Sequence, residues 1–172
     1  MIVNERVVSY INSLDRGNSD ICNIIEKEAI EDQVPIIRKE MGNLLKVLLK
    51  LKQPKSILEV GTAVGYSSIL MSENMPVNCK IVTIENYDKR IPIARNNIKR
   101  AGKEDCIQLI EGDAMEVLKE LEGPFDFIFM DAAKGQYINY LPEVLRLMPH
   151  GGLLISDNIL QEGELVESRY VV

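Results

Sequence analysis

Apolar and polar positions follow two different spacings along the chain, and the change comes after residue 52. Before it, apolar residues recur at helical spacing: one stripe lies in residues 21–29, behind a Ser19 suited to cap a helix, and a second runs from Met41 to Leu51, beyond Pro35. We therefore expect an N-terminal helical segment, and we predict that both stripes face the core.

Residues 53–172 alternate short apolar runs with helical stretches. The apolar runs predict buried strands at Ser56–Val60, Lys80–Ile84, Ile107–Ile110, Phe125–Met130 and Leu153–Ser156. The stretches between them predict helices at Tyr66–Met75, Asp88–Ala101, Ala114–Leu121 and Gln136–Leu147. This alternation is typical of the Rossmann-like α/β class, a parallel sheet with helices on both faces. We expect a single domain over residues 1–172, with its chemistry at the carboxyl ends of the strands.

The composition narrows the classes of protein further. A net charge of −6 argues against broad, nonspecific binding of nucleic acid, although it leaves room for a local basic patch. The three cysteines are far apart and form no CxxC pair, so we expect buried thiols in a cytoplasmic protein. A lone His150 beside glycines argues against a histidine base or a histidine-rich metal site. No apolar run approaches the ~20 residues that span a bilayer, so no membrane partner is expected.

Three of the predicted strands end in residues suited to a nucleoside ligand. The first leads into Glu59-Val-Gly61-Thr-Ala-Val-Gly65, where glycines permit a tight turn and a close ligand; a purely structural turn explains the pattern equally well. Glu85, at the end of the second strand, suits a bidentate hydrogen bond to ribose hydroxyls. Asp113, after the third strand, suits either an adenine amino group or the cap of the next helix.

The fourth and fifth predicted strands end in hard oxygen donors. Asp131 follows one, and Asp157-Asn158 follows the other. Each residue alone is more often a cap or turn residue, but neighbouring strand ends would bring the three together. Such a set favours Mg²⁺, Mn²⁺ or Ca²⁺ over zinc.

With these residues identified, the chain resembles the cation-dependent class I O-methyltransferases, the group of the catechol and caffeoyl-CoA enzymes and their bacterial relatives. The resemblance runs from about Val34 to Glu162. It is carried by Ile57–Ser68, Thr83–Glu85, Phe127–Lys134 and Ile155–Asn158.

The resemblance implies an enzyme that transfers the methyl group of S-adenosylmethionine. It implies that the cofactor is held by Glu59, Gly61, Gly65, Ser67, Glu85, Asp113 and Asp131. It implies a divalent metal, Mg²⁺ or a similar ion, on Asp131, Asp157 and Asn158. Lys134 would stand beside the reacting hydroxyl, with Asp131 as its catalytic partner.

Within the family, residues 33–41 are most similar to the Gram-positive bacterial branch, some of whose members methylate 5-hydroxyuridine at the tRNA wobble position. We therefore predict tRNA as the substrate, with Arg38 and Lys39 near it, and a small catechol-like phenol as the alternative. The catechol enzymes carry bulky residues where this chain has Ala132 and Ala133, and the chain has no Trp, which argues against an aromatic clamp.

One departure concerns the end of the chain. The family sheet has seven strands, and the sixteen residues after Ser156 are too few to supply the last two, so we expect these to be missing. This keeps open a catalytically dead fragment that only binds S-adenosylmethionine. An NAD-dependent dehydrogenase is the other alternative to the methyltransferase, but the glycine spacing and the acidic strand ends argue against it. A homodimer is left open.

Overall fold

A computed structural model of the chain describes residues 4–15 and 17–159. In this part, five parallel strands form one sheet in the order β3-β2-β1-β4-β5. The strands are β1 (Ser56–Val60), β2 (Lys80–Glu85), β3 (Ile107–Glu111), β4 (Phe127–Met130) and β5 (Leu153–Ser156). The parallel sheet predicted from the sequence is thus confirmed. The strands expected to be missing concern residues outside the described part.

The helices occupy the predicted stretches, with shifts at their ends. They are α1 (Glu5–Ser13), α2 (Asp20–Glu31), α3 (Lys39–Lys52), α4 (Tyr66–Asn74), α5 (Ile91–Arg100), α6 (Ala114–Glu120) and α7 (Tyr137–Leu147), with a 3-10 turn, η1 (Lys134–Gln136). The fourth strand starts two residues later than predicted. Its preceding residue, Asp126, instead uses its carboxylate to accept the backbone N–H groups of Lys55 and Ser56, at 3.0 and 3.1 Å.

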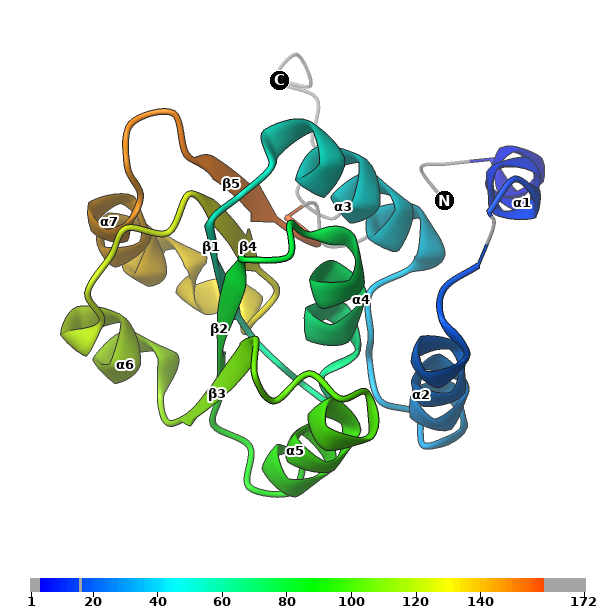
Figure 1. The fold of residues 1–172 in the computed structure, drawn as a ribbon, viewed down its shortest axis with the longest axis horizontal. Coiled ribbons are helices and arrows are strands. Elements are labelled where there is room, and N and C mark those ends of the chain that lie inside the picture. Colours follow the sequence, from blue (N-terminus) through cyan, green and yellow to red (C-terminus); the bar gives the residue numbers. More distant parts are fainter. Residues whose placement is uncertain (1–3, 16, 160–172) are drawn as a thin grey trace, which may run out of the picture.

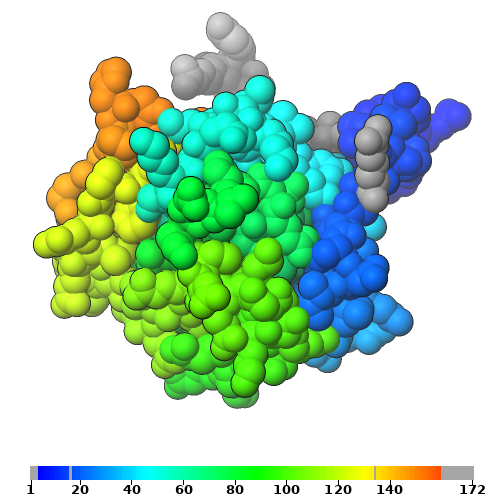
Figure 2. Space-filling view, in the orientation of Figure 1, coloured from blue at the N-terminus to red at the C-terminus, as the bar shows by residue number. Residues whose placement is uncertain are grey.

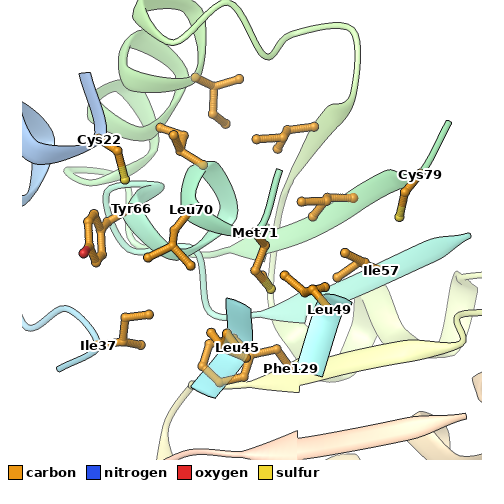
Figure 3. Close-up of a cluster of buried hydrophobic side chains, with 14 of the residues drawn as sticks. Cys22, Ile37, Leu45, Leu49, Ile57, Tyr66, Leu70, Met71, Cys79 and Phe129 are labelled. Carbon is orange, nitrogen blue, oxygen red and sulfur yellow. The ribbon is translucent and has the colours of Figure 1, made fainter. Parts of the chain in front are cut away.

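Helices cover both faces of the sheet, and each face has its own apolar core (Figure 1). The α2–α5 face is centred on side chains such as Ile57 and Phe129 of the sheet, against which Leu45 and Leu49 of α3 lie (Figure 3). The opposite face packs α6 and α7 on Leu58 and its neighbours. Burial of these side chains, at roughly 25 cal/mol per Å² of apolar surface, holds the layers together.

The prediction that both N-terminal stripes face the core is partly wrong. In α3, Leu45 and Leu49 are fully buried, but Leu44 is 45% and Leu51 77% exposed. The face of α3 that packs against α4 is therefore narrower than the apolar stripe predicted from the sequence.

The first helix stands apart from this core. Helix α1 buries none of its described residues and projects from the body of the molecule (Figure 2). The Asn12 side-chain amide donates to a Glu40 carboxylate oxygen at 2.7 Å and ties α1 to α3. None of the helices in the described part is long and apolar enough to cross a membrane.

The register of the sheet decides where function can be located. Val60 pairs with both Ile84 and Met130, and Met130 pairs with Ser156, so β1, β4 and β5 end at the same level and β2 ends one residue further on. The residues that follow these ends are therefore neighbours at one edge of the sheet.

Candidate functional site

A cavity of about 460 Å³ opens at the carboxyl edge of the sheet. Among the residues proposed from the sequence, those that line it are Gly61, Ser67, Glu85, Asp131 and Asn158. The structure thus brings residues from four strand ends and from the start of α4 onto one hollow. A cavity of this size matches those that hold a nucleoside-sized ligand.

The loop after β1 turns tightly around the end of β2. The Ile84 carbonyl accepts the backbone N–H groups of both Gly61 and Thr62, each at 3.1 Å. Gly61 has φ of +107°, and a Cβ there would lie 2.3 Å from the Asp131 carbonyl oxygen. Gly65, with φ of +84°, is the N-cap of α4. Only glycine allows the first strand end to approach Asp131 this closely.

Glu85 joins β2 to this loop. Its carboxylate accepts the backbone N–H of Ala63 at 2.7 Å on one oxygen, and those of Tyr87 and Asn86 at 2.9 and 3.1 Å on the other. A carboxylate has about four acceptor positions, so room remains for a ligand hydroxyl. The backbone donors fix the orientation of Glu85 at the cavity wall.

Glu59 does not line the cavity but lies fully buried beneath the loop. One of its oxygens accepts hydrogen bonds from the hydroxyls of Ser68 and Thr83, and Thr83 shares a further hydrogen bond of 2.6 Å with Thr62. The other oxygen has no hydrogen-bond partner among the described residues. Burial raises the pKa of Glu59 to about 7, although serine and threonine hydroxyls act against it. Thr62 and Thr83 were not predicted as site residues from the sequence; a polar residue inside an apolar strand was the available signal for Thr83.

We expect this carboxyl to make stability depend on pH. The folded chain keeps the Glu59 proton up to a pKa of about 7, whereas the unfolded chain releases it near 4.5. Folded protein therefore binds more protons between these values, and stability falls as pH rises through them, by about 3 kcal/mol. Urea unfolding at pH 5 and pH 8 measures this fall. In Glu59→Gln the fall should be smaller by that amount; parallel pH curves for the two proteins would contradict it.

The predicted metal ligands follow neighbouring strands. The Asp131 N–H donates to the Val60 carbonyl and the Asp157 N–H to the Met130 carbonyl, both at 2.9 Å, so the two aspartates are held level. Both carboxylates also act on Tyr137, whose pKa burial raises well above its usual value, with further increases from Asp131 and Asp157. Asn158 has φ of +56° and borders the cavity.

This donor set consists of two carboxylates and one amide. In residues 4–15 and 17–159 the structure has no group of three or more His, Cys, Asp or Glu side chains that could hold a metal ion. A mixed oxygen set still fits Mg²⁺, which takes one or two carboxylates and fills its other positions with water or substrate oxygens.

Besides Glu59, three predicted residues do not line the cavity: Gly65, Asp113 and Asp157. Asp113 caps α6, accepting the Met115 N–H at 2.9 Å, while its neighbours Gly112 and Ala114 line the cavity. Lys134 begins η1, and its side chain lies outside the described part of the structure.

Other cavity residues carried no recognisable signal in the sequence. Tyr87 and Arg90 line the cavity, with the Arg90 guanidinium 5.3 Å from the Tyr87 ring centroid. Asn97 of α5, which is buried, donates to the Val64 carbonyl at 2.9 Å and holds the glycine loop from below.

The chain is similar to known methyltransferases in sequence. The family model described as O-methyltransferase matches residues 19–170. A catechol O-methyltransferase of Niastella koreensis is 36% identical over 95% of this chain and 76% of its own length. A caffeoyl-CoA O-methyltransferase of Eucalyptus globulus is 37% identical, over 73% of this chain and 53% of that enzyme.

The chain is also similar to solved structures of methyltransferases. An SAH-bound methyltransferase of Podospora anserina has a TM-score of 0.88 at 31% identity, covering 93% of this chain and 71% of that one. An O-methyltransferase of Bacillus cereus in complex with SAH has a TM-score of 0.85 at 30% identity, and the match covers 94% of this chain and 76% of that one. These matches argue against the alternative raised from the sequence, an NAD-dependent dehydrogenase. The chain belongs, by sequence and by fold, to the O-methyltransferase family.

Proposed function

We propose that the chain is an S-adenosylmethionine-dependent and divalent-cation-dependent O-methyltransferase. The observation that carries the proposal is the placement of Asp131, Asp157 and Asn158 after adjacent strands, with Asp131 and Asn158 lining a cavity that reaches Glu85. Oxygen donors at one end and a backbone-fixed carboxylate at the other suit two ligands held side by side. The SAH-bound relatives of the same fold support the choice of cofactor.

The cofactor end of the cavity is assigned to the glycine loop and β2. Glu85 would accept the two ribose hydroxyls, because backbone donors already fix its carboxylate. Gly61 would admit the ligand close to the backbone, and Ser67 would add a hydroxyl near the start of α4. Gly65 would act indirectly, by shaping the loop at the N-cap of α4. Asp113 remains a proposed acceptor for the adenine amino group, and Glu59 supports the loop from beneath.

The reacting end is assigned to the strand ends of β4 and β5. Asp131, Asp157 and Asn158 would hold the cation, which when bound would lower the pKa of a coordinated substrate hydroxyl. Asp131 lines the cavity and its backbone lies against Gly61 of the glycine loop, so it would serve both ligands. Lys134, at the start of η1, would accept the proton that the hydroxyl releases.

Two substrate classes remain, and both offer a hydroxyl beside a second oxygen. The printed names of the relatives favour a small phenol. A basic segment favours the tRNA 5-hydroxyuridine: residues 89–103 contain six Lys or Arg and no Asp or Glu, in a chain of net charge −6. One of the six, Arg90, lines the cavity.

A methyl-transfer assay separates these possibilities. The protein is incubated with labelled S-adenosylmethionine and Mg²⁺, with hypomodified tRNA or with a panel of catechols, and each reaction is repeated in excess EDTA. Label in only one substrate class identifies the class, and label that persists in EDTA contradicts the cation. Cofactor binding without any label would instead support the fragment that binds but does not react.

Charge reversal near the cavity tests the tRNA assignment. Arg38 immediately precedes α3 and follows Ile37, which lines the cavity. The Nζ atom of Lys39 lies 3.9 Å from a carboxylate oxygen of Glu26, and the Lys39 side chain is 53% exposed. Changing both to Glu should lower methylation of tRNA and flatten its salt dependence, because fewer counterions would be released. Methylation of a catechol should change little.

A matched variant reverses Lys50 and Lys52 at the other end of the same helix, away from the cavity. It should retain activity on tRNA. Equal losses on tRNA and catechol in the Arg38 and Lys39 variant would point to damage of the core site, and no loss on tRNA would remove this segment from the RNA surface.

A further inference from the structure

The hydroxyl of Tyr137 lies between the two strand ends that carry the proposed metal ligands. Tyr137 is the first residue of α7, directly after η1. Its phenol oxygen is 3.1 Å from the Met130 carbonyl oxygen, at the end of β4, and 3.2 Å from the Asp157 carbonyl oxygen, just after β5. One O–H group thus faces two acceptors, as in a three-centre hydrogen bond.

The second of these contacts fixes a particular peptide plane. The Asp157 carbonyl belongs to the peptide that joins Asp157 to Asn158, and the N–H of the same peptide donates to the Asp157 carboxylate at 2.7 Å. The plane is therefore held at both edges. Its orientation matters because Asn158 has φ of +56°, a left-handed conformation that asparagine tolerates but that the surroundings must maintain.

We propose that Tyr137 is a positioning residue whose hydroxyl holds this peptide plane and thereby directs Asn158 toward the cavity. The hydrogen bond also keeps Asp157 level with Asp131, since the Met130 carbonyl accepts both the Tyr137 hydroxyl and the Asp157 N–H. The consequence for metal binding rests on the proposed function; the effect on the peptide plane does not. Tyr137 also ties the turn that begins at Lys134 to the same strand ends.

Tyr137→Phe removes only the hydroxyl, because the ring packs against the core of the α6–α7 face in either residue. Without the donor, the Asp157 carbonyl can rotate away, and Asn158 can leave the left-handed region. The matched control is Tyr10→Phe, the same change at a tyrosine on α1 that is 65% exposed.

The first measurement is amide hydrogen exchange of Asp157 and Asn158 by NMR, on protein without metal. Exchange at these two amides should be about tenfold faster in Tyr137→Phe, the size expected for one lost hydrogen bond. Amides in the middle of β1 and β2 should be unchanged, and Tyr10→Phe should match the unaltered protein throughout.

The second measurement is calorimetric titration with Mn²⁺. Affinity should fall about tenfold in Tyr137→Phe, as for other residues that orient metal ligands, while S-adenosylmethionine affinity without metal stays the same. A merely structural role would lower both affinities and the melting temperature together. Unchanged exchange at Asp157 and Asn158 would overturn the proposal. Absence of Mn²⁺ binding in the unaltered protein would overturn the proposed function instead, and the exchange measurement would still decide the role of Tyr137.

Discussion

Replacing Gly61 with alanine is expected to abolish cofactor binding and to destabilise the fold. An alanine Cβ would lie 2.3 Å from the Asp131 carbonyl oxygen and 2.8 Å from its carbonyl carbon, which are backbone atoms that no side-chain rotation can move aside. The positive φ of Gly61 adds strain of its own. Together these effects amount to roughly 2–6 kcal/mol.

The measurements are urea unfolding and calorimetric titration with S-adenosylmethionine. Gly135→Ala is the matched control, because a Cβ at that position meets no atom within 4 Å. Its unfolding free energy and cofactor affinity should be close to those of the unaltered protein. Wild-type affinity in Gly61→Ala would show that the cofactor does not approach this loop.

Replacing Asp157 with alanine should lower turnover by about a thousandfold or more, since it removes a charged ligand and with it several kcal/mol of stabilisation of the reacting oxygen. Asp157 follows β5 and is not among the residues that line the cavity, so S-adenosylmethionine affinity should be largely retained. Calorimetry and a methyl-transfer assay over a range of Mg²⁺ concentrations test both statements.

Asp105→Ala serves as the control, because Asp105 is an exposed aspartate away from the cavity. Its activity should match that of the unaltered protein. If Asp157→Ala kept full activity in excess EDTA, the assignment of metal ligands to these strand ends would be wrong.

The sequence predicted the sheet and its reactive edge because both depend on local patterns. Buried parallel strands are short, continuous apolar runs, and the helices between them keep a period near 3.6 residues. A residue that follows such a run must lie at the carboxyl edge. This reasoning placed Glu85, Asp131 and Asn158 beside the cavity before any contact between strands was known.

Local patterns do not show which strands are neighbours or how their register is set. The network of Glu59, Thr83 and Thr62 depends on β1 lying next to β2 in one register, and no spacing in the sequence specifies that register. The contact of Tyr137 with Asp157 depends on β4 lying beside β5. The assignment of Glu59 to the cofactor came from the family resemblance; the structure buries this carboxylate beneath the loop, outside the cavity lining.

The position of β1 in the sheet has a consequence for how the protein folds. β1 pairs with β2 close by in the sequence, but also with β4, joining Ile57 to Phe127. Closing so long a loop is entropically unfavourable, so this pairing is expected late in folding. The hollow between β1 and β4 cannot exist before it, and a partly folded chain has no site to fill. Ligand binding is therefore linked to completion of the whole sheet, so a bound cofactor would protect the sheet and the helices packed on it from unfolding and proteolysis.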